Sequence, residues 1–139
     1  MPSPNLTRFD HVVLTVASIE ATCSFYTYAL GMEVERFRGP EGGERHALRF
    51  GTVKINLHEV GKEREPKALL PTPGGADLCL LTDEPVEDWL EHLARKGVEV
   101  ELGPVPRQGA LGELTSIYVR DPDRNLIEIA RYQGAAAAE

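Results

Sequence analysis

The chain has 139 residues, 42% of them hydrophobic, and this size and composition suit one compact domain with its own core. Its formal net charge of −7, from 15 basic and 22 acidic residues, excludes a general attraction to nucleic acid or to anionic lipid. No stretch approaches the roughly 20 apolar residues of a membrane span, so we expect a cytoplasmic protein without nucleic acid or membrane partners.

The first part of the chain predicts a strand, a helix and three further strands. Residues 9–16 alternate between apolar and polar side chains, which is typical of a half-buried strand. Ser18 suits the N-cap of a helix whose apolar residues recur at helical spacing until Gly31 ends it. The three strands that follow are predicted at residues 32–38, 45–50 and 52–59.

The second part of the chain repeats this order after a linker rich in proline and glycine at residues 61–75. A strand at residues 76–82 precedes a helix that is capped by Asp83 or Glu84 and ended by Gly97. The remaining strands are expected at residues 98–102, 114–120 and 125–131, with a flexible loop at 105–113 and a frayed tail at 135–138.

A sequence repeat supports this division. The segment Gly31-Met32-Glu33-Val34-Glu35 recurs as Gly97-Val98-Glu99-Val100-Glu101, an offset of 66 residues that also carries His11 onto Asp77. Equal spacing in two halves of a short chain indicates a duplicated supersecondary unit. We therefore predict an α+β fold of two tandem βαβββ modules, at residues 7–60 and 76–132, within one domain spanning residues 1–139.

The first and last strands of each module have one apolar face and one face with polar side chains. The residues on the polar faces are His11, Asn56, His58, Asp77, Cys79 and Glu128. If the two sheets join into one curved sheet, these side chains line a common concave surface, where unpaired polar groups would be costly. Imidazoles and carboxylates suit a divalent ion such as Zn, Ni, Mn, Co or Fe, so the pattern indicates a metal site.

Each of these residues also has an interpretation without a metal. A single strand histidine is more often a hydrogen-bonded core or rim residue, and Asp77 could cap a turn after two glycines. Glu128 is the strongest candidate, because a charged residue in an otherwise apolar strand needs a partner. Cys79 and Cys23 are interpreted as reduced, packed thiols, and His46 and His92 as surface residues.

Three segments resemble the vicinal oxygen chelate superfamily, which includes glyoxalase I, extradiol dioxygenases and the fosfomycin- and bleomycin-resistance proteins. They are His11-Val-Val-Leu-Thr-Val, the segment from Phe25 to Val34, and Asp121-Pro-Asp-Arg-Asn-Leu-Ile-Glu-Ile. The resemblance spans nearly the whole chain, and residues 47–74 are similar to small glyoxalase-domain proteins, some of them labelled virulence proteins. It implies a U-shaped, partly open mixed sheet around one metal ion.

The resemblance also implies roles for individual residues. His11 matches the histidine ligand of the first module, and Glu128 matches the glutamate ligand near the C-terminus. Asp77 stands where the family usually has a histidine, and Asn56 stands where glyoxalase I has a glutamate that takes part in proton transfer. The second departure argues against glyoxalase I activity itself. His58, one inward position further along, can supply the missing donor.

We therefore expect a metal-dependent enzyme of lyase or isomerase type that acts on a small oxygenated substrate. His11, His58, Asp77 and Glu128 would hold the divalent ion, and Glu128 or Asp77 would act as the general base. Two alternatives stay open: a single-domain extradiol dioxygenase using Fe(II), and a metal-free small-molecule binding or resistance protein. The resemblance further implies a homodimer. Arg49 and Arg107 could contact an anionic substrate, although solvated charges are the commoner interpretation.

Overall fold

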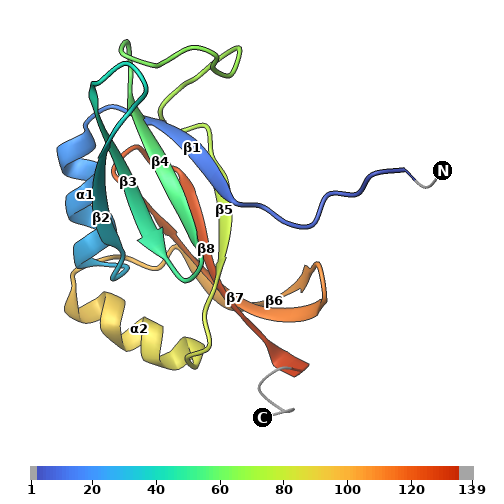
Figure 1. Cartoon of the computed structure of the whole chain (residues 1–139). Coiled ribbons are helices and arrows are strands. Elements are labelled where there is room, and N and C mark those ends of the chain that lie inside the picture. Colours follow the sequence, from blue (N-terminus) through green and yellow to red (C-terminus); the bar gives the residue numbers. More distant parts are fainter. Residues whose placement is uncertain (1–2, 135–139) are drawn as a thin grey trace.

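The computed structural model describes residues 3–134, so the tail predicted to fray at 135–138 lies outside the described residues (Figure 1). The first module comprises β1 (His11–Val16), α1 (Ile19–Tyr28), β2 (Glu33–Arg38), β3 (Glu44–Phe50) and β4 (Val53–Glu59). The second comprises β5 (Asp77–Leu81), α2 (Val86–Arg95), β6 (Leu102–Gly109), β7 (Gly112–Arg120) and β8 (Leu126–Tyr132). The order confirms the α+β class and the duplicated βαβββ unit.

Each module forms a four-stranded mixed sheet with the same topology. The strand orders are β1-β4-β3-β2 and β5-β8-β7-β6. In both sheets the first strand pairs in parallel with the last, and the other pairs are antiparallel. β1 and β5 are therefore edge strands, and each has one side without a strand partner in its sheet.

The two helices have different residues and hydrogen bonds at their N-termini. α1 begins as predicted, because the Ser18 hydroxyl accepts a hydrogen bond from the Ala21 amide at 3.0 Å. The predicted cap of α2 by Asp83 or Glu84 is wrong, since Pro85 occupies the N-cap and makes no side-chain capping bond. The Thr82 hydroxyl organises this entry instead: it accepts from the Glu84 amide at 3.1 Å and from the Trp89 indole at 2.9 Å.

Two predictions for the second module are also wrong. The strand expected at residues 98–102 and the loop expected at 105–113 are replaced by β6, which begins at Leu102 and pairs with β7 in a hairpin. The pairing shifts register between Leu102 and Val105. Such a bulge breaks the alternation on which a sequence-based strand assignment depends. The Gly103-Pro104 pair at the bulge is also typical of a turn or loop rather than of a strand.

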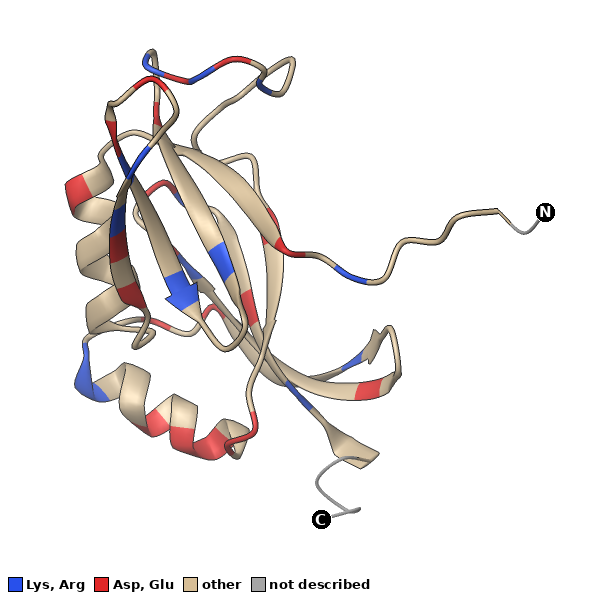
Figure 2. Cartoon of the chain, viewed as in Figure 1, with Lys and Arg blue, Asp and Glu red and all other residues tan. Residues whose placement is uncertain are grey.

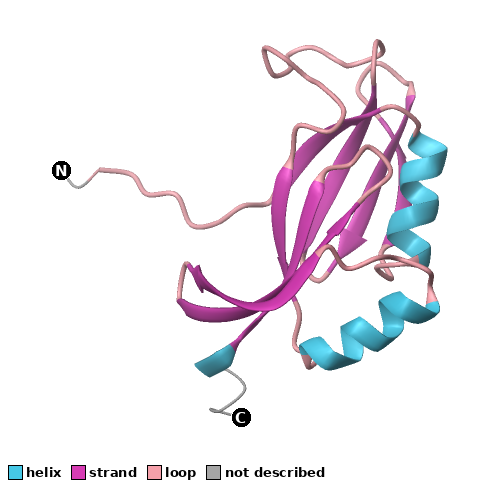
Figure 3. Ribbon diagram, turned by 180° about the vertical axis from the view of Figure 1, so that it is seen from behind, coloured by secondary structure: helices cyan, strands magenta, loops and turns pink. Residues whose placement is uncertain are grey.

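The apolar faces of both sheets contribute to one core. Its members come from the strands and helices of both modules: Leu14, Val16, Tyr26, Met32, Leu48, Ile55, Leu57, Val86, Leu93, Ile117, Val119, Ile127 and Ile129. Both helices lie on one side of the strands (Figure 3). Because side chains alternate along a strand, the polar face of each sheet points away from this shared core.

A buried polar network joins the two modules. The Tyr26 hydroxyl on α1 donates to Asp121 at 2.6 Å, and the Asn125 side chain donates to the same carboxylate oxygen at 2.9 Å. The second oxygen of Asp121 accepts from the Asp123 and Asn125 amides, each at 2.9 Å. Burial and the adjacent Asp121 charge raise the pKa of Tyr26, so its phenol stays protonated and can donate.

Two cysteines predicted to pack and two histidines predicted to lie on the surface differ in their actual exposure. Both cysteines are free thiols; Cys23 packs partly against the core, whereas Cys79 is exposed, so its predicted packing is wrong. The surface interpretation of the two histidines is wrong as well. His92 is half-buried and its Nε2 lies 2.9 Å from the Ala29 carbonyl, and the His46 side chain is only 18% exposed. Within residues 3–134, no helix is long and apolar enough to cross a membrane.

Candidate metal site and adjoining cavity

His11 begins β1 on the outer, polar face of the first sheet, and its side chain is 42% exposed. Its Nδ1 lies 2.9 Å from an Asp10 carboxylate oxygen, and this contact lowers the pKa of Asp10. With Asp10 accepting the Nδ1 proton, the lone pair of Nε2 points away from the carboxylate. A histidine held in this way by a carboxylate is a typical metal ligand.

Glu128 lies on the outer face of the second sheet, in the middle of β8. The Ser116 hydroxyl on β7 donates to its carboxylate at 2.6 Å. Tyr118 is the register partner of Glu128, and the Tyr118 hydroxyl accepts from Arg107 Nε at 2.8 Å. A guanidinium only donates, so the phenol keeps its own proton for another acceptor. Ser116 therefore fixes the Glu128 carboxylate, and Tyr118 presents a phenol on the same strand pair.

The strand register places the predicted donors in two equivalent pairs. His11 is opposite Lys54, so Asn56 is its diagonal neighbour two residues further along β4. Asp77 is opposite Leu126, so Glu128 is its diagonal neighbour by the same step. At about 3.3 Å per residue, each step is about 7 Å along the strands. The repeat in the sequence thus corresponds to a repeat of donor pairs in space.

The register also separates Asn56 from His58. His58 lies four residues beyond the level of His11, about 13 Å along the strand, whereas Asn56 lies at half that separation. The Asn56 Oδ1 atom is buried and has no hydrogen-bond partner. His58 stays a predicted ligand, but the register favours Asn56 as the nearer donor to an ion bound by His11.

The described part of one chain forms no cluster of ionisable metal donors. Among the described residues, no three His, Cys, Asp or Glu side chains lie close enough to hold a metal ion. The outer faces that carry the two pairs also expose apolar side chains: Val13 is 47% exposed, Leu81 59% and Leu102 46%. The predicted residues therefore form two half-sites, one on the outer face of each sheet, where these exposed side chains lie beside buried ones such as Ser116 and Tyr118.

His58 lies at the far end of β4, beside a cavity of about 450 Å³ that the inter-module linker covers. Burial lowers the pKa of His58, and so do the nearby Arg45 and Arg64 guanidinium groups. The imidazole is therefore held in its neutral form. The cationic neighbours also make this end of β4 a poor place for a metal ion.

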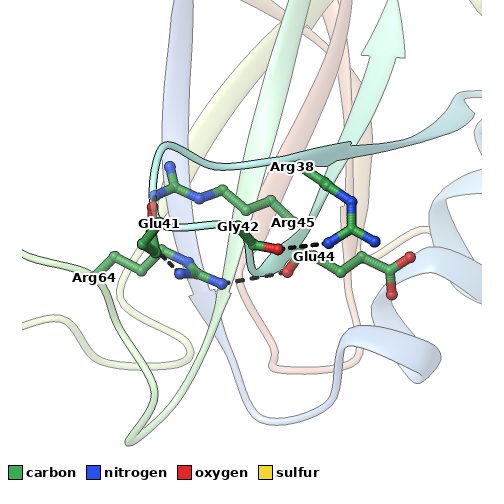
Figure 4. A network of polar contacts seen from close by, with 6 residues as sticks. All are labelled: Arg38, Glu41, Gly42, Glu44, Arg45 and Arg64. Atoms are coloured by element: carbon green, nitrogen blue, oxygen red, sulfur yellow. Dashed lines mark hydrogen bonds and ion pairs between the residues drawn. The ribbon is translucent and has the colours of Figure 1, made fainter.

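A group of charged residues fastens the linker to the β2–β3 hairpin (Figure 4). The Glu41 carboxylate accepts from Arg45 at 2.7 and 2.9 Å and also from Arg64 of the linker, whose other amino group donates to the Glu44 carbonyl at 3.3 Å. Its own backbone amide and the two guanidinium groups lower the pKa of Glu41 to about 2. A side chain on Gly39 or Gly43 would collide with these guanidinium groups.

We expect Glu41→Gln to loosen the linker. Since exposed ion pairs contribute only weakly to stability, trypsin should cleave the linker roughly two- to fivefold faster in this variant. Mass spectrometry of a timed digest would measure the rates after Lys62 and Arg64. Glu44→Gln is the matched control, because only the backbone of Glu44 takes part in the network. Equal rates in Glu41→Gln and the parent chain would show that the network does not hold the linker.

The two arginines predicted to contact an anionic substrate already have partners. Arg49 Nε lies 3.0 Å from Glu35, and Arg107 belongs to β6 and donates to Tyr118. Basic and acidic residues are interleaved along the chain (Figure 2). Sequence reasoning missed Asp10, Ser116 and Tyr118; the Asp-His dipeptide is a usable signal for the first, but cross-strand neighbours need the register.

Comparison with known proteins gives one family model, described as the Glyoxalase/Bleomycin resistance protein/Dioxygenase superfamily, which matches residues 8–129. The chain is 52% identical to the glyoxalase domain-containing protein RDO1 of Mycosarcoma maydis, covering 91% of this chain and 69% of that protein. It is 50% identical to the virulence protein STM3117 of Salmonella typhimurium, covering 90% of this chain and 84% of that protein.

Two further matches are a solved structure and a named enzyme. An integron cassette protein from the mobile metagenome of V. cholerae has a solved structure with a TM-score of 0.88 and 47% identity, covering 94% of this chain and 99% of that one. Biphenyl-2,3-diol 1,2-dioxygenase 2 of Rhodococcus globerulus is 34% identical, covering 88% of this chain and 61% of that enzyme.

Proposed function

The chain belongs to the glyoxalase/bleomycin resistance protein/dioxygenase superfamily, and from this we propose that it is a metal-dependent enzyme acting on a small oxygenated molecule. The reaction type we propose is that of a lyase or isomerase. The observation that carries the proposal is the equivalent placement of two donor pairs, His11 with Asn56 and Asp77 with Glu128, on outward-facing strands.

The donor set fits a divalent ion. Asn56 Oδ1 is a buried oxygen without a partner, His11 has a free ring nitrogen, and Glu128 is fixed by a hydroxyl. Nitrogen and oxygen donors of this kind suit Zn, Ni, Mn, Co or Fe. Once bound, such an ion would act as a Lewis acid toward oxygen atoms of the substrate.

We propose a homodimer in which the two half-sites of different copies meet. One donor pair lies on β1 and its neighbour β4, and the other lies on β5 and its neighbour β8. Because β1 and β5 are edge strands, contact between β1 of one copy and β5 of the other would bring one pair from each copy together. The residues before β1 extend away from the body of the chain, and Leu6 and Phe9 there are 101% and 80% exposed. A second copy would cover these apolar groups together with the outer faces.

Within such a site the residues have separate tasks. Asp10 keeps the His11 ring in one tautomer, and Ser116 keeps the Glu128 carboxylate in one orientation. Asp77 is exposed on the same face and is the proposed proton acceptor, in place of the glutamate that Asn56 replaces. Tyr118 can donate its phenol proton to a substrate oxygen while Arg107 holds the ring in place.

We expect Ser116→Ala to weaken metal binding about 10- to 100-fold, because the Glu128 carboxylate loses the donor that orients it. Titration of chelator-treated protein with Ni²⁺ or Mn²⁺ would measure the affinity. Thr115→Val is the matched control, since Thr115 directly precedes Ser116 on β7 and points to the opposite face. An unchanged affinity in Ser116→Ala would remove Ser116 from the proposed site.

The dioxygenase relative supports a second candidate function, ring cleavage by Fe(II) and dioxygen. One histidine with carboxylate and amide oxygens is close to, but not the same as, the two-histidine, one-carboxylate set of such enzymes. Catechol turnover in air separates the candidates. Activity with Fe(II) and none with Zn²⁺ or Ni²⁺ would favour the dioxygenase, whereas oxygen-independent activity would favour the lyase or isomerase.

A further inference from the structure

The cavity beside His58 is large enough for a small molecule. It has a volume of about 450 Å³, within the usual range for ligand pockets. Its walls come from β1, the end of β4, the linker, the residue before β5 and the turn before β8. The lining includes Val13, His58, Lys67, Ala68, Leu70 and Pro71.

The lining contains no aspartate or glutamate, although the chain has 22 acidic residues and a net charge of −7. Four smaller cavities in the described part of the chain each have at least one acidic side chain in the lining. The ionisable groups in the large cavity are Lys67 and His58. An anion can therefore enter this cavity without meeting a carboxylate on its walls.

The rest of the lining is mainly aliphatic. Val13 of β1 and Ala68, Leu70 and Pro71 of the linker contribute aliphatic groups to the walls, whereas the Leu14 side chain belongs to the core. Lys67 pairs with Glu65, which is not part of the lining, and this contact raises the pKa of Lys67. The ammonium group therefore stays charged, and it has three N–H donors, so pairing with one carboxylate leaves others available.

The geometry points to a binding site for the carboxylate of a small organic acid with an apolar body. Lys67 contacts the carboxylate, and the aliphatic walls hold the body. A singly charged group is favoured over a phosphate dianion, because the cavity offers one permanent cation among apolar walls. Val13 is opposite Asn56 in the register, so the cavity continues along the same face as the donor pair of His11 and Asn56.

This inference deepens the proposed function, since it names the substrate class for that site. A small organic acid whose charged end lies under the linker would extend its other end along β1 toward His11. Binding of the charged end needs no metal ion. It can therefore be measured on chelator-treated protein, and the outcome does not depend on the metal site.

The test is a titration of the isotope-labelled, chelator-treated chain with benzoate, benzamide and inorganic phosphate, followed by amide chemical shifts. Benzoate should shift the amides of Val13, Lys67, Ala68 and Leu70, and it should bind roughly tenfold more tightly than benzamide, which lacks the charge. Phosphate should shift these amides less than benzoate at equal concentration.

Lys67→Met should weaken benzoate binding about tenfold and leave benzamide binding unchanged. Lys62→Met is the matched control, because Lys62 lies on the same linker but outside the lining of this cavity. The inference is overturned if benzoate causes no shifts at these residues, if benzamide binds equally well, or if Lys67→Met leaves benzoate binding unchanged. If phosphate binds more strongly than benzoate, the inference is also overturned, because the cavity is then a site for an inorganic anion.

Discussion

Asp121→Ala is expected to lower the free energy of unfolding by about 3 to 5 kcal/mol, the largest loss of stability predicted for any single substitution here. The Asp121 side chain is almost fully buried at 5% exposure and accepts four hydrogen bonds. Without it, the Tyr26 hydroxyl and the Asn125 side chain become buried donors with no acceptor, and each such donor costs about 1–3 kcal/mol. Urea unfolding followed by circular dichroism would measure the change.

Two further variants test whether the loss of stability comes from this network or from any change in the turn before β8. Tyr26→Phe removes one donor and should cost less, about 1 to 3 kcal/mol. Asp123→Ala removes a half-buried carboxylate that accepts only from the Ala17 amide, at 3.2 and 3.3 Å, and should cost about 1 kcal/mol or less. If Asp121→Ala costs no more than Asp123→Ala, the network does not join the modules.

His11→Ala and Glu128→Gln are each expected to reduce metal affinity at least about 100-fold while leaving the fold intact. His11 is 42% exposed and Glu128 lies on the outer face, so neither residue packs in the core. Metal analysis of protein purified without chelator, together with titration by Ni²⁺ or Mn²⁺, would measure the loss.

His58→Ala is the informative control for these variants. Because His58 lies about 13 Å along the strand from the level of His11, its removal should change metal affinity much less than removal of His11. Asn56→Ala should reduce metal affinity more than His58→Ala does. A loss in His58→Ala equal to that in His11→Ala would restore His58 as a ligand and exclude the choice of Asn56.

Alternation along the strands predicted the faces of the site residues correctly. His11, Asn56, Asp77 and Glu128 share the outer faces because side chains alternate in every strand. The repeat offset of 66 residues carries His11 onto Asp77, and the equivalent register of β4 and β8 makes Asn56 the mate of Glu128. The helix of the first module was also predictable, since Ser18 and Gly31 are local signals that tertiary contacts did not override.

Other features depend on contacts between distant residues. The bulge between Leu102 and Val105 interrupts alternation, so β6 could not be distinguished from a loop. Ser116 and Tyr118 become relevant only because β7 pairs with β8, and Thr82 replaced the expected acidic caps through a contact with Trp89. The division of the donors between two outward faces follows from the packing of both sheets on one core, which no local pattern encodes.

The most direct test of the shared metal site is to mix subunits carrying His11→Ala with subunits carrying Glu128→Gln and to isolate the mixed dimer. If each site combines His11 of one copy with Glu128 of the other, the mixed dimer keeps one intact pair and should bind about one metal ion, whereas each parent variant binds none. If both residues serve the same chain's site, every site in the mixed dimer is damaged. A mixed dimer without metal would therefore contradict the account.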